Sequence, residues 1–175
     1  MEKISNLIYA YQAANGSYIG IPYSKLDCQG FVEKVLADCG IKKDWRGSND
    51  MWRNAVSWKG TVEECKSKFG GKVPLGAWLF TIKYDGGEIE RGYHDGLGNA
   101  AHVGIRIQDG AIHSTTGGVQ LCAFPDSKRW THAGLCKYID FSGYGEDKSP
   151  KDKIFESLSA IDAALTDIKA NLERI

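Results

Sequence analysis

The sequence has no excess charge of either sign and no long apolar run. Its 22 basic and 22 acidic side chains cancel, and no basic stripe stands out, so neither nucleic acid nor an anionic membrane surface is an expected partner. No apolar stretch is long enough to span a bilayer, and the first residues do not form the basic flank and apolar core of an export signal. We therefore expect synthesis in the cytoplasm and, if the protein acts outside the cell, delivery by another route.

Cysteine is present, but in a pattern that disfavours its two common structural uses. Five cysteines are an odd number at irregular spacing, which argues against a disulfide framework. No C-x-x-C pair indicates a structural zinc site, and neither a metal nor a cofactor is expected. The chain has 175 residues, of which 42% are hydrophobic and 25% charged. One compact domain with an accessory element can therefore bury a hydrophobic core without disulfide bonds.

The order of periodic segments predicts helices first and strands afterwards. Residues 1–14 read as a helix with Ile4, Ile8 and Tyr11 on one side, and a second helix begins at Cys28 and ends at Gly40. A polar stretch, 42–71, contains a short helix starting at Ser48. This order predicts an α+β fold, with N-terminal helices packed on a central antiparallel sheet. The predicted strands are residues 78–83, 102–108, 111–115, 119–124 and 134–141.

Two further segments follow the predicted domain of residues 1–141. Residues 142–152 have the composition of a linker, and residues 153–175 are predicted to form one helix. In the helix, Leu158, Leu165 and Leu172 fall at heptad position a and four isoleucines fall at d, an arrangement that leans toward tetramers in parallel coiled coils. The sequence therefore predicts a homo-oligomer through 154–175. The alternative is a single amphipathic helix that folds back onto the domain.

Cys28 is the candidate nucleophile. It follows Asp27, a predicted helix N-cap, and the free amides and positive dipole end of a helix N-terminus lower a thiol's pKa. Gly30 leaves the backbone uncrowded for a substrate carbonyl, and the same amides are candidates for an oxyanion hole. The alternative is a buried structural cysteine, a description that fits the other four: Cys39, Cys65, Cys122 and Cys136.

Two histidines lie on neighbouring predicted strands. With Asp109-Gly110 as a two-residue turn, Arg106 faces His113, and His102 lies on the same face of the sheet. In this register His102 is four residues along from the position opposite His113, roughly 13 Å away, so a bulge or a wider turn must bring the rings together. The alternative is two half-buried strand histidines without a shared role.

Several motifs occur in an order typical of one family. Residues 27–32 read Asp-Cys-Gln-Gly-Phe-Val, residues 102–105 read His-Val-Gly-Ile, and Ile112-His113 follows. Residues 21–23 (Ile-Pro-Tyr) and 73–80 (Val-Pro-Leu-Gly-Ala-Trp-Leu-Phe) add two weaker matches. Together they resemble the NlpC-type family of papain-like cysteine peptidases, which cut peptides of bacterial peptidoglycan. The resemblance covers roughly residues 5–141.

The resemblance implies a papain-like fold and a cysteine endopeptidase in which Cys28 attacks, His102 is its base and His113 orients His102. It implies cleavage of a stem-peptide amide, typically between the D-glutamate side-chain carboxyl and a diamino acid. Prophage lysis or a virion-associated role would suit a chain without an export signal. The alternatives are an amidase or acyltransferase on the same scaffold and a non-catalytic wall-binding or phage structural module. Candidates to contact substrate are Tyr23, Gln29, Gly30, Trp45 and Trp52.

This sequence departs from the family pattern at several points. Gln29 stands where the family has serine, Ala77 where it tends to have aspartate, and the loop between Tyr23 and Cys28 is short. Residues 84–101 form a long glycine-rich segment that leads directly into His102, so we expect it to border the active site and to act as a lid. Its acidic residues match no calcium-binding loop.

Overall fold

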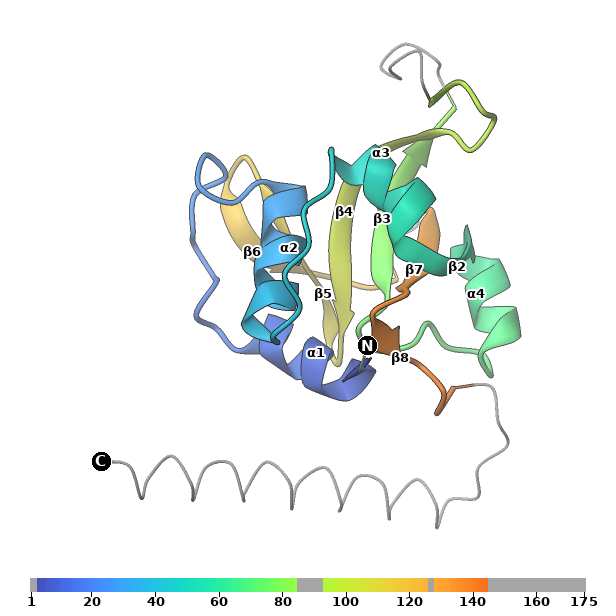
Figure 1. The fold of residues 1–175 in the computed structure, drawn as a ribbon, viewed down its shortest axis with the longest axis horizontal. Coiled ribbons are helices and arrows are strands. Elements are labelled where there is room, and N and C mark those ends of the chain that lie inside the picture. Colours follow the sequence, from blue (N-terminus) through green and yellow to red (C-terminus); the bar gives the residue numbers. More distant parts are fainter. Residues whose placement is uncertain (1–2, 85–92, 126–127, 145–175) are drawn as a thin grey trace. The chain divides into compact units, whose positions relative to one another are not determined.

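The computed structural model describes residues 3–84, 93–125 and 128–144 (Figure 1). Residues up to Tyr144 form one compact unit and Gly145–Ile175 a second. Most of the predicted linker and the whole heptad-patterned segment therefore lie outside the described residues, and their prediction stays a prediction.

A six-stranded antiparallel sheet forms the centre of the first unit. Its strand order is β2-β7-β3-β4-β5-β6, and a short parallel pair, β1-β8, lies apart from it. Together with the helices this arrangement is compatible with the predicted α+β class. The bounds are β1 Ile4–Ser5, β2 Val56–Thr61, β3 Trp78–Lys83, β4 Asn99–Ile107, β5 Gly110–Thr115, β6 Gly118–Cys122, β7 His132–Cys136 and β8 Ile139–Asp140.

The helices precede most of the strands along the chain. They are α1 (Asn6–Ala14), α2 (Cys28–Asp38), α3 (Ser48–Asp50), which continues as a π-helical turn η1 (Met51–Ala55), and α4 (Val62–Lys68). The first three lie on the same face of the sheet (Figure 1).

Two hydrophobic clusters cover the two faces of the sheet, because alternate strand residues point to opposite sides. On one face, Phe31 and Leu36 of α2 belong to a cluster with Phe80 and Val103. On the other face, Val62 and Cys65 of α4 belong to a second cluster that includes Leu79, Ala133 and Trp130. The sheet is thus buried from both sides around β3 and β4, the strands that lead to the candidate site.

Three predictions about the elements need correction. The helix predicted at 1–14 begins at Asn6, and it buries Tyr9 and Ala13 while Ile8 and Tyr11 are 57% and 78% exposed. The cause is tertiary: the Tyr9 hydroxyl accepts a hydrogen bond of 3.1 Å from the Trp78 indole in the core, which fixes the helix rotation. The strand predicted at 134–141 is two strands, β7 and β8.

The third correction concerns the polar stretch, which contains the edge strand β2 and the helix α4 in addition to the predicted short helix at Ser48. Helix α4 begins at a capping box, in which the Thr61 side chain accepts from the Glu64 amide and Glu64 reaches back to the Thr61 amide. Strand β2 lies at the sheet edge with little fully buried surface, so its sequence lacks the apolar alternation of the inner strands.

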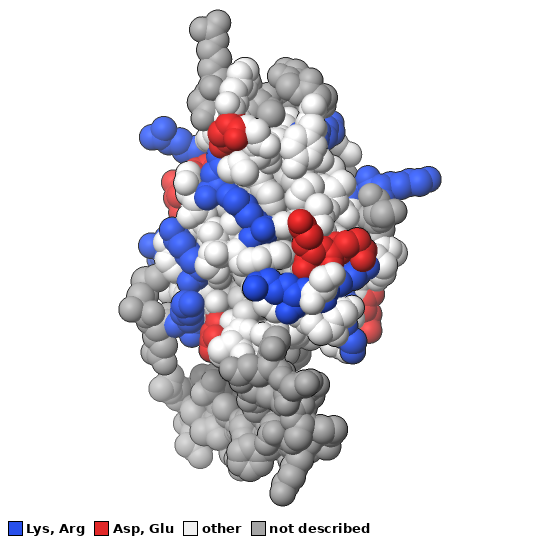
Figure 2. Space-filling view, turned by 90° about the vertical axis from the view of Figure 1, so that its right-hand side faces the viewer, with Lys and Arg blue, Asp and Glu red and all other residues white. Residues whose placement is uncertain are grey.

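Charge is mixed on the face that carries α4 and β2. Figure 2 shows basic and acidic side chains interspersed on this face, with no continuous field of one sign. Among the helices in the described part of the chain, none is both long and apolar enough to cross a membrane.

Candidate active site

Cys28 occupies the first position of α2, as predicted. Asp27 is the N-cap, and its carboxylate accepts a hydrogen bond of 2.6 Å from the Gly30 amide. A side-chain carbon added at Gly30 would lie 3.1 Å from that carboxylate oxygen, so glycine here allows the cap to close tightly. The N–H of Gly30 is engaged by the cap, and the expected role of this glycine, leaving the backbone uncrowded for a substrate carbonyl, stays a prediction.

The Cys28 thiol is buried between the helix and strand β4. The side chain is 8% exposed, and it accepts hydrogen bonds from the backbone of Val103 and Gln29 and from the Tyr23 hydroxyl. Burial raises the pKa of the thiol and outweighs these hydrogen bonds, which lower it. The helix N-terminus therefore does not by itself produce a reactive thiolate. The nearby sulfur also raises the pKa of Tyr23.

Strands β4 and β5 separate where the helix enters. Their paired residues run only from Ile105↔Ile112 to Ile107↔Gly110, so His102 and Val103 lie beyond the last pair. The Ser114 hydroxyl of β5 donates instead to the Leu26 carbonyl, just before the helix. This opening in the ladder lets a helix N-terminus reach a strand backbone, and it places the sulfur next to the residue that follows His102.

The hairpin register differs from the predicted one. The turn residues are Gln108 and Asp109, and Arg106 faces Ala111 instead of His113. Continued along the strands, this register puts Gly104 opposite His113, so His102 is only two residues from the facing position. Diagonal neighbours of this kind are within reach of aromatic side chains. The register removes the need for the bulge or wider turn that the sequence required.

The two histidine rings are in direct contact. His102 Nε2 lies 2.7 Å from His113 Nδ1, and the ring centroids are 5.0 Å apart at 75°. Trp130 stacks on His102 with centroids 5.6 Å apart and an interplanar angle of 20°, and its edge meets His113. At Gly104 an added side-chain carbon would lie 2.7 Å from Trp130 and 3.0 Å from His113 Cβ, so only glycine leaves room for this stack.

Arg129 completes a chain of three side chains. Its guanidinium nitrogen lies 2.9 Å from His113 Nε2, on the opposite side of the ring from His102. Burial, followed by the charge of Arg129, lowers the pKa of His102 to about 4. Burial, followed by the charges of His102 and Arg129, lowers the pKa of His113 to about 4. Both imidazoles are therefore neutral at pH 7.

An open cavity of about 630 Å³ lies beside these residues. Because Tyr23 and His102 both line it and Tyr23 bonds to the Cys28 thiol, the cavity gives access to the sulfur–imidazole region. Among the residues that the structure describes, its lining includes Lys128 and Arg129 and no acidic side chain. The lining residues are Tyr23, Thr81, His102, Ser114, Thr115, Thr116, Lys128 and Arg129.

Of the other residues expected to contact substrate, three have structural contacts away from this cavity. The Gln29 amide donates to Glu33 at 2.7 Å and to the Trp45 carbonyl, which holds the segment after α2 against the helix. Trp45 packs edge-on against Trp78, with centroids 5.5 Å apart. Trp52 is 3% exposed and packs on Phe80. Trp52 therefore belongs to the core, where large aromatic side chains bury most area, and the half-buried Trp45 packs against it.

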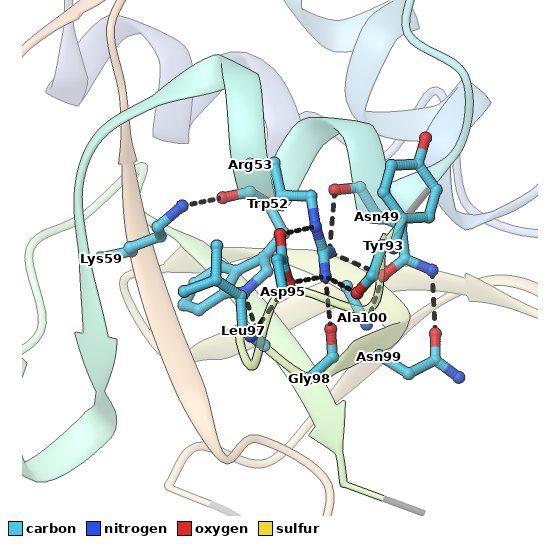
Figure 3. A network of polar contacts seen from close by, with 10 residues as sticks. All are labelled: Asn49, Trp52, Arg53, Lys59, Tyr93, Asp95, Leu97, Gly98, Asn99 and Ala100. Atoms are coloured by element: carbon cyan, nitrogen blue, oxygen red, sulfur yellow. Dashed lines mark hydrogen bonds and ion pairs between the residues drawn. The ribbon is translucent and has the colours of Figure 1, made fainter. Parts of the chain in front are cut away.

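The described end of the segment 84–101 is tied to η1 by a polar network (Figure 3). Arg53 forms a two-pronged ion pair with Asp95 at 2.7 and 2.8 Å and also donates to the Tyr93 and Gly98 carbonyls. The Trp52 indole donates to the Leu97 carbonyl at 2.9 Å. The hydrogen bonds from Arg53 lower the pKa of Asp95 to about 2. This network fixes the chain just before β4, and hence the position of His102.

Sequence reasoning found Tyr23, Cys28 and the two histidines but missed Arg129 and Trp130. In the sequence, Lys128 and Arg129 stand beside Trp130 just ahead of a predicted strand. Their spacing gives no indication that they lie near His113. Searches for related proteins add no family: the chain matches no protein-family model and has no significant match among curated proteins.

Proposed function

We propose that this protein is a papain-like cysteine endopeptidase that hydrolyses amide bonds in peptidoglycan stem peptides through a Cys28 thioacyl-enzyme. The observation that carries the proposal is the 2.7 Å contact between His102 Nε2 and His113 Nδ1, beside a strand backbone that hydrogen-bonds to the Cys28 thiol. A nucleophile, a base and an orienting group in that order are the parts that acyl transfer to cysteine requires.

The orientation of His102 fits the role of base. Its Nε2 is turned toward His113, so Nδ1 is the nitrogen left to exchange a proton with the thiol. In the proposed reaction, His102 Nδ1 takes the thiol proton while the sulfur attacks the amide carbon. His102 then gives that proton to the leaving amine as the carbon–nitrogen bond breaks. Water, deprotonated by His102, attacks the thioester and releases the acid, which restores the thiol.

The raised pKa of Cys28 suits a nucleophile activated by its base at the moment of attack, and not a thiolate present at rest. The Tyr23 hydroxyl, already bonded to the sulfur, is placed to contact the reacting carbonyl. Because the Gly30 amide is engaged by Asp27, the Cys28 amide, one of the unpaired first-turn donors, is the backbone group proposed to stabilise the oxyanion.

The substrate part of the proposal rests on the motif order, which resembles cell-wall peptidases, and on the cavity chemistry. A stem peptide carries free carboxylates, and the basic residues Lys128 and Arg129 line the cavity. The papain-like arrangement is proposed on the same basis: a nucleophilic cysteine opening a helix that packs on an antiparallel sheet carrying the histidines.

The experiment is digestion of purified peptidoglycan by the wild type, Cys28→Ala and Cys39→Ala, with fragments identified by mass spectrometry. Cys39 lies at the other end of the same helix and serves as the matched control. We expect new stem-peptide ends from the wild type and Cys39→Ala, and a loss of at least a thousandfold in Cys28→Ala. Intact stem peptides freed from glycan would instead indicate an amidase. Equal binding of wild type and Cys28→Ala to the wall without any product would favour a binding module.

A further inference from the structure

The hydrogen-bond directions in the Arg129–His113–His102 chain are fixed by chemistry. A guanidinium has only donors and stays protonated, so His113 Nε2, 2.9 Å from it, must accept. A neutral imidazole carries a single N–H, so the proton of His113 is on Nδ1. That nitrogen lies 2.7 Å from His102 Nε2, which therefore accepts in turn. Neutral His102 then carries its own proton on Nδ1.

This arrangement opposes the proposed catalysis. The nitrogen of His102 that must take the thiol proton already holds one. Protonating His102 Nε2 instead would place two N–H donors face to face at 2.7 Å. The low pKa values of both histidines, to which the Arg129 charge contributes, agree with a pair kept neutral. As long as Arg129 donates to His113, His102 is held in the tautomer that is unable to act as base.

We propose that Arg129 binds a substrate carboxylate in the cavity and thereby releases His113, so that the histidine pair changes to the tautomer that accepts the Cys28 proton. Arg129 is in this account a positioning and specificity residue: it contacts the substrate away from the cleaved bond and acts on Cys28 through the two imidazoles. The inference rests on the proposed function for its substrate class.

The cavity supplies the reason to expect a carboxylate. Arg129 and Lys128 line it together with the hydroxyl-bearing Thr115 and Thr116, and the described lining residues include no acidic side chain. Planar guanidinium groups bind carboxylates through two parallel hydrogen bonds. A D-glutamyl residue linked through its side-chain carboxyl keeps its α-carboxylate free, so a substrate cut at that link carries the required anion beside the reacting bond.

The tautomer change conserves protons. When the carboxylate accepts from Arg129 and draws the guanidinium away, His113 Nε2 loses its donor and takes a proton from a water molecule that enters in the place of the guanidinium. The proton on His113 Nδ1 passes to His102 Nε2, and the proton on His102 Nδ1 leaves to water. The pair is neutral before and after. His102 Nε2–H now donates to His113 Nδ1, and His102 Nδ1 is unprotonated and able to accept the thiol proton.

The test is long-range ¹H–¹⁵N NMR of the histidine rings in the full-length chain, which distinguishes the two tautomers. The probes are two tripeptides, L-Ala-γ-D-Glu-L-Lys and the same peptide with the α-carboxylate converted to carboxamide, added to Cys28→Ala so that nothing is cleaved. In the free protein we expect His113 with its proton on Nδ1. The carboxylate peptide should move it to Nε2 and bind roughly tenfold to a hundredfold more tightly than the carboxamide.

Arg129→Met should show the Nε2–H tautomer without any peptide and lose the preference for the carboxylate. Arg46→Met, an exposed arginine outside the cavity, is the charge-matched control and should behave as the unsubstituted chain. An Nε2–H tautomer of His113 in the free protein overturns the proposal. So does equal binding of the two peptides, or no binding of the carboxylate peptide at millimolar concentration. Cleavage is assayed separately: a tautomer switch without cleavage by the wild type counts against the proposed function, and cleavage without a switch counts against the role of Arg129.

Discussion

At the scale of single residues, Cys28 differs from Cys39 and Cys65 in its hydrogen bonds, which oppose the effect of burial on the pKa of the thiol. Burial raises the pKa of Cys39 to about 11 and the pKa of Cys65 to about 12, and Cys28 is raised as well. At Cys28 two backbone donors and a tyrosine hydroxyl oppose that effect, whereas no hydrogen bond opposes it at Cys39 or Cys65. A thiol that is neutral at rest but surrounded by donors is protected from oxidation and becomes nucleophilic when its proton is removed.

The buried histidine pair predicts a stability that falls in mild acid. Both folded pKa values are about 4, below the ordinary 6.5, so the unfolded chain binds more protons between these two values. The contribution is complete above pH 6.5 and is lost as the pH falls toward 4, by on the order of 3 kcal/mol for each histidine. Urea unfolding at pH 7.0, 5.5 and 4.5 measures it.

The double variant His102→Gln, His113→Gln is the reference, because carboxylates and His132 titrate equally in both chains. Its stability should change less with pH than that of the wild type. Parallel curves for the two proteins over this range would show that the histidines are not held neutral by burial.

Much of the residue-scale site could be predicted from the sequence, and the reason for the rest is physical. Cys28 was recognisable from its helix N-cap and His102 and His113 from their strands. Arg129 and Trp130 reach the site only through tertiary packing, and no local period marks them. Trp45 and Trp52 had the composition of a binding cleft, but burial and ring packing place Trp52 in the core and Trp45 against it.

At the scale of elements, the separation of β4 from β5 is what makes the site. The sequence predicted both strands and the helix α2, because each has a clear apolar period. The predicted hairpin register was wrong because Asp109-Gly110 is a stronger turn signal in the sequence than Gln108-Asp109. In the structure, Gln108 and Asp109 are the two turn residues. That shift decides whether the histidines touch, and it is set by packing around Gly104 that no local pattern encodes.

Gly104→Ala tests this packing. The added carbon would lie 2.7 Å from Trp130 and 2.9 Å from the Ile112 carbonyl, so the strands or the indole must move. We expect a loss of roughly 1–3 kcal/mol in the free energy of unfolding and a loss of the His102–His113 contact, seen in the ring ¹⁵N shifts. Gly117→Ala, where the nearest atom is 3.6 Å away, is the control and should be near neutral. Equal stability of the two variants would contradict the close packing at Gly104.

The network around Arg53 predicts that the approach to β4 depends on one guanidinium. Arg53→Met removes the donors to Asp95 and to two carbonyls, and should cost about 2 kcal/mol. Hydrogen exchange should accelerate at the Leu97 and Ala100 amides, which are held by Asp95 and Asn49. Arg53→Lys should restore little, because an ammonium lacks the fork geometry. Unchanged exchange at both amides in Arg53→Met would argue that the backbone holds this segment without the network.

At the scale of the whole molecule, the fold brings four sequence-distant pieces to one cavity: the loop with Tyr23, strand β3, the β4–β5 pair and the segment before β7. The architecture was predictable because helices precede strands in the chain. The edge elements β2 and α4 were not, since they are polar and short. The role of residues 154–175 rests on their heptad pattern alone.

The heptad pattern predicts self-association of the full chain. Sedimentation of the 19.2 kDa chain should give a multiple of that mass. Leucine at a and isoleucine at d favour a tetramer. Leu165→Asp, which places a charge in the predicted seam, should give a monomer with the same activity on a soluble peptide. A wild type that stays monomeric at high concentration would rule out the coiled coil and leave the alternative of one helix folded onto the domain.

The most direct test of the central claim is to trap the acyl-enzyme. Wild-type protein mixed with muropeptides and quenched in acid within its first turnover should carry a thioester-linked fragment on the peptide that contains Cys28, and His102→Ala should carry none. A fragment attached to another residue, or rapid cleavage of the muropeptides with no adduct at any quench time, would contradict Cys28 as the nucleophile.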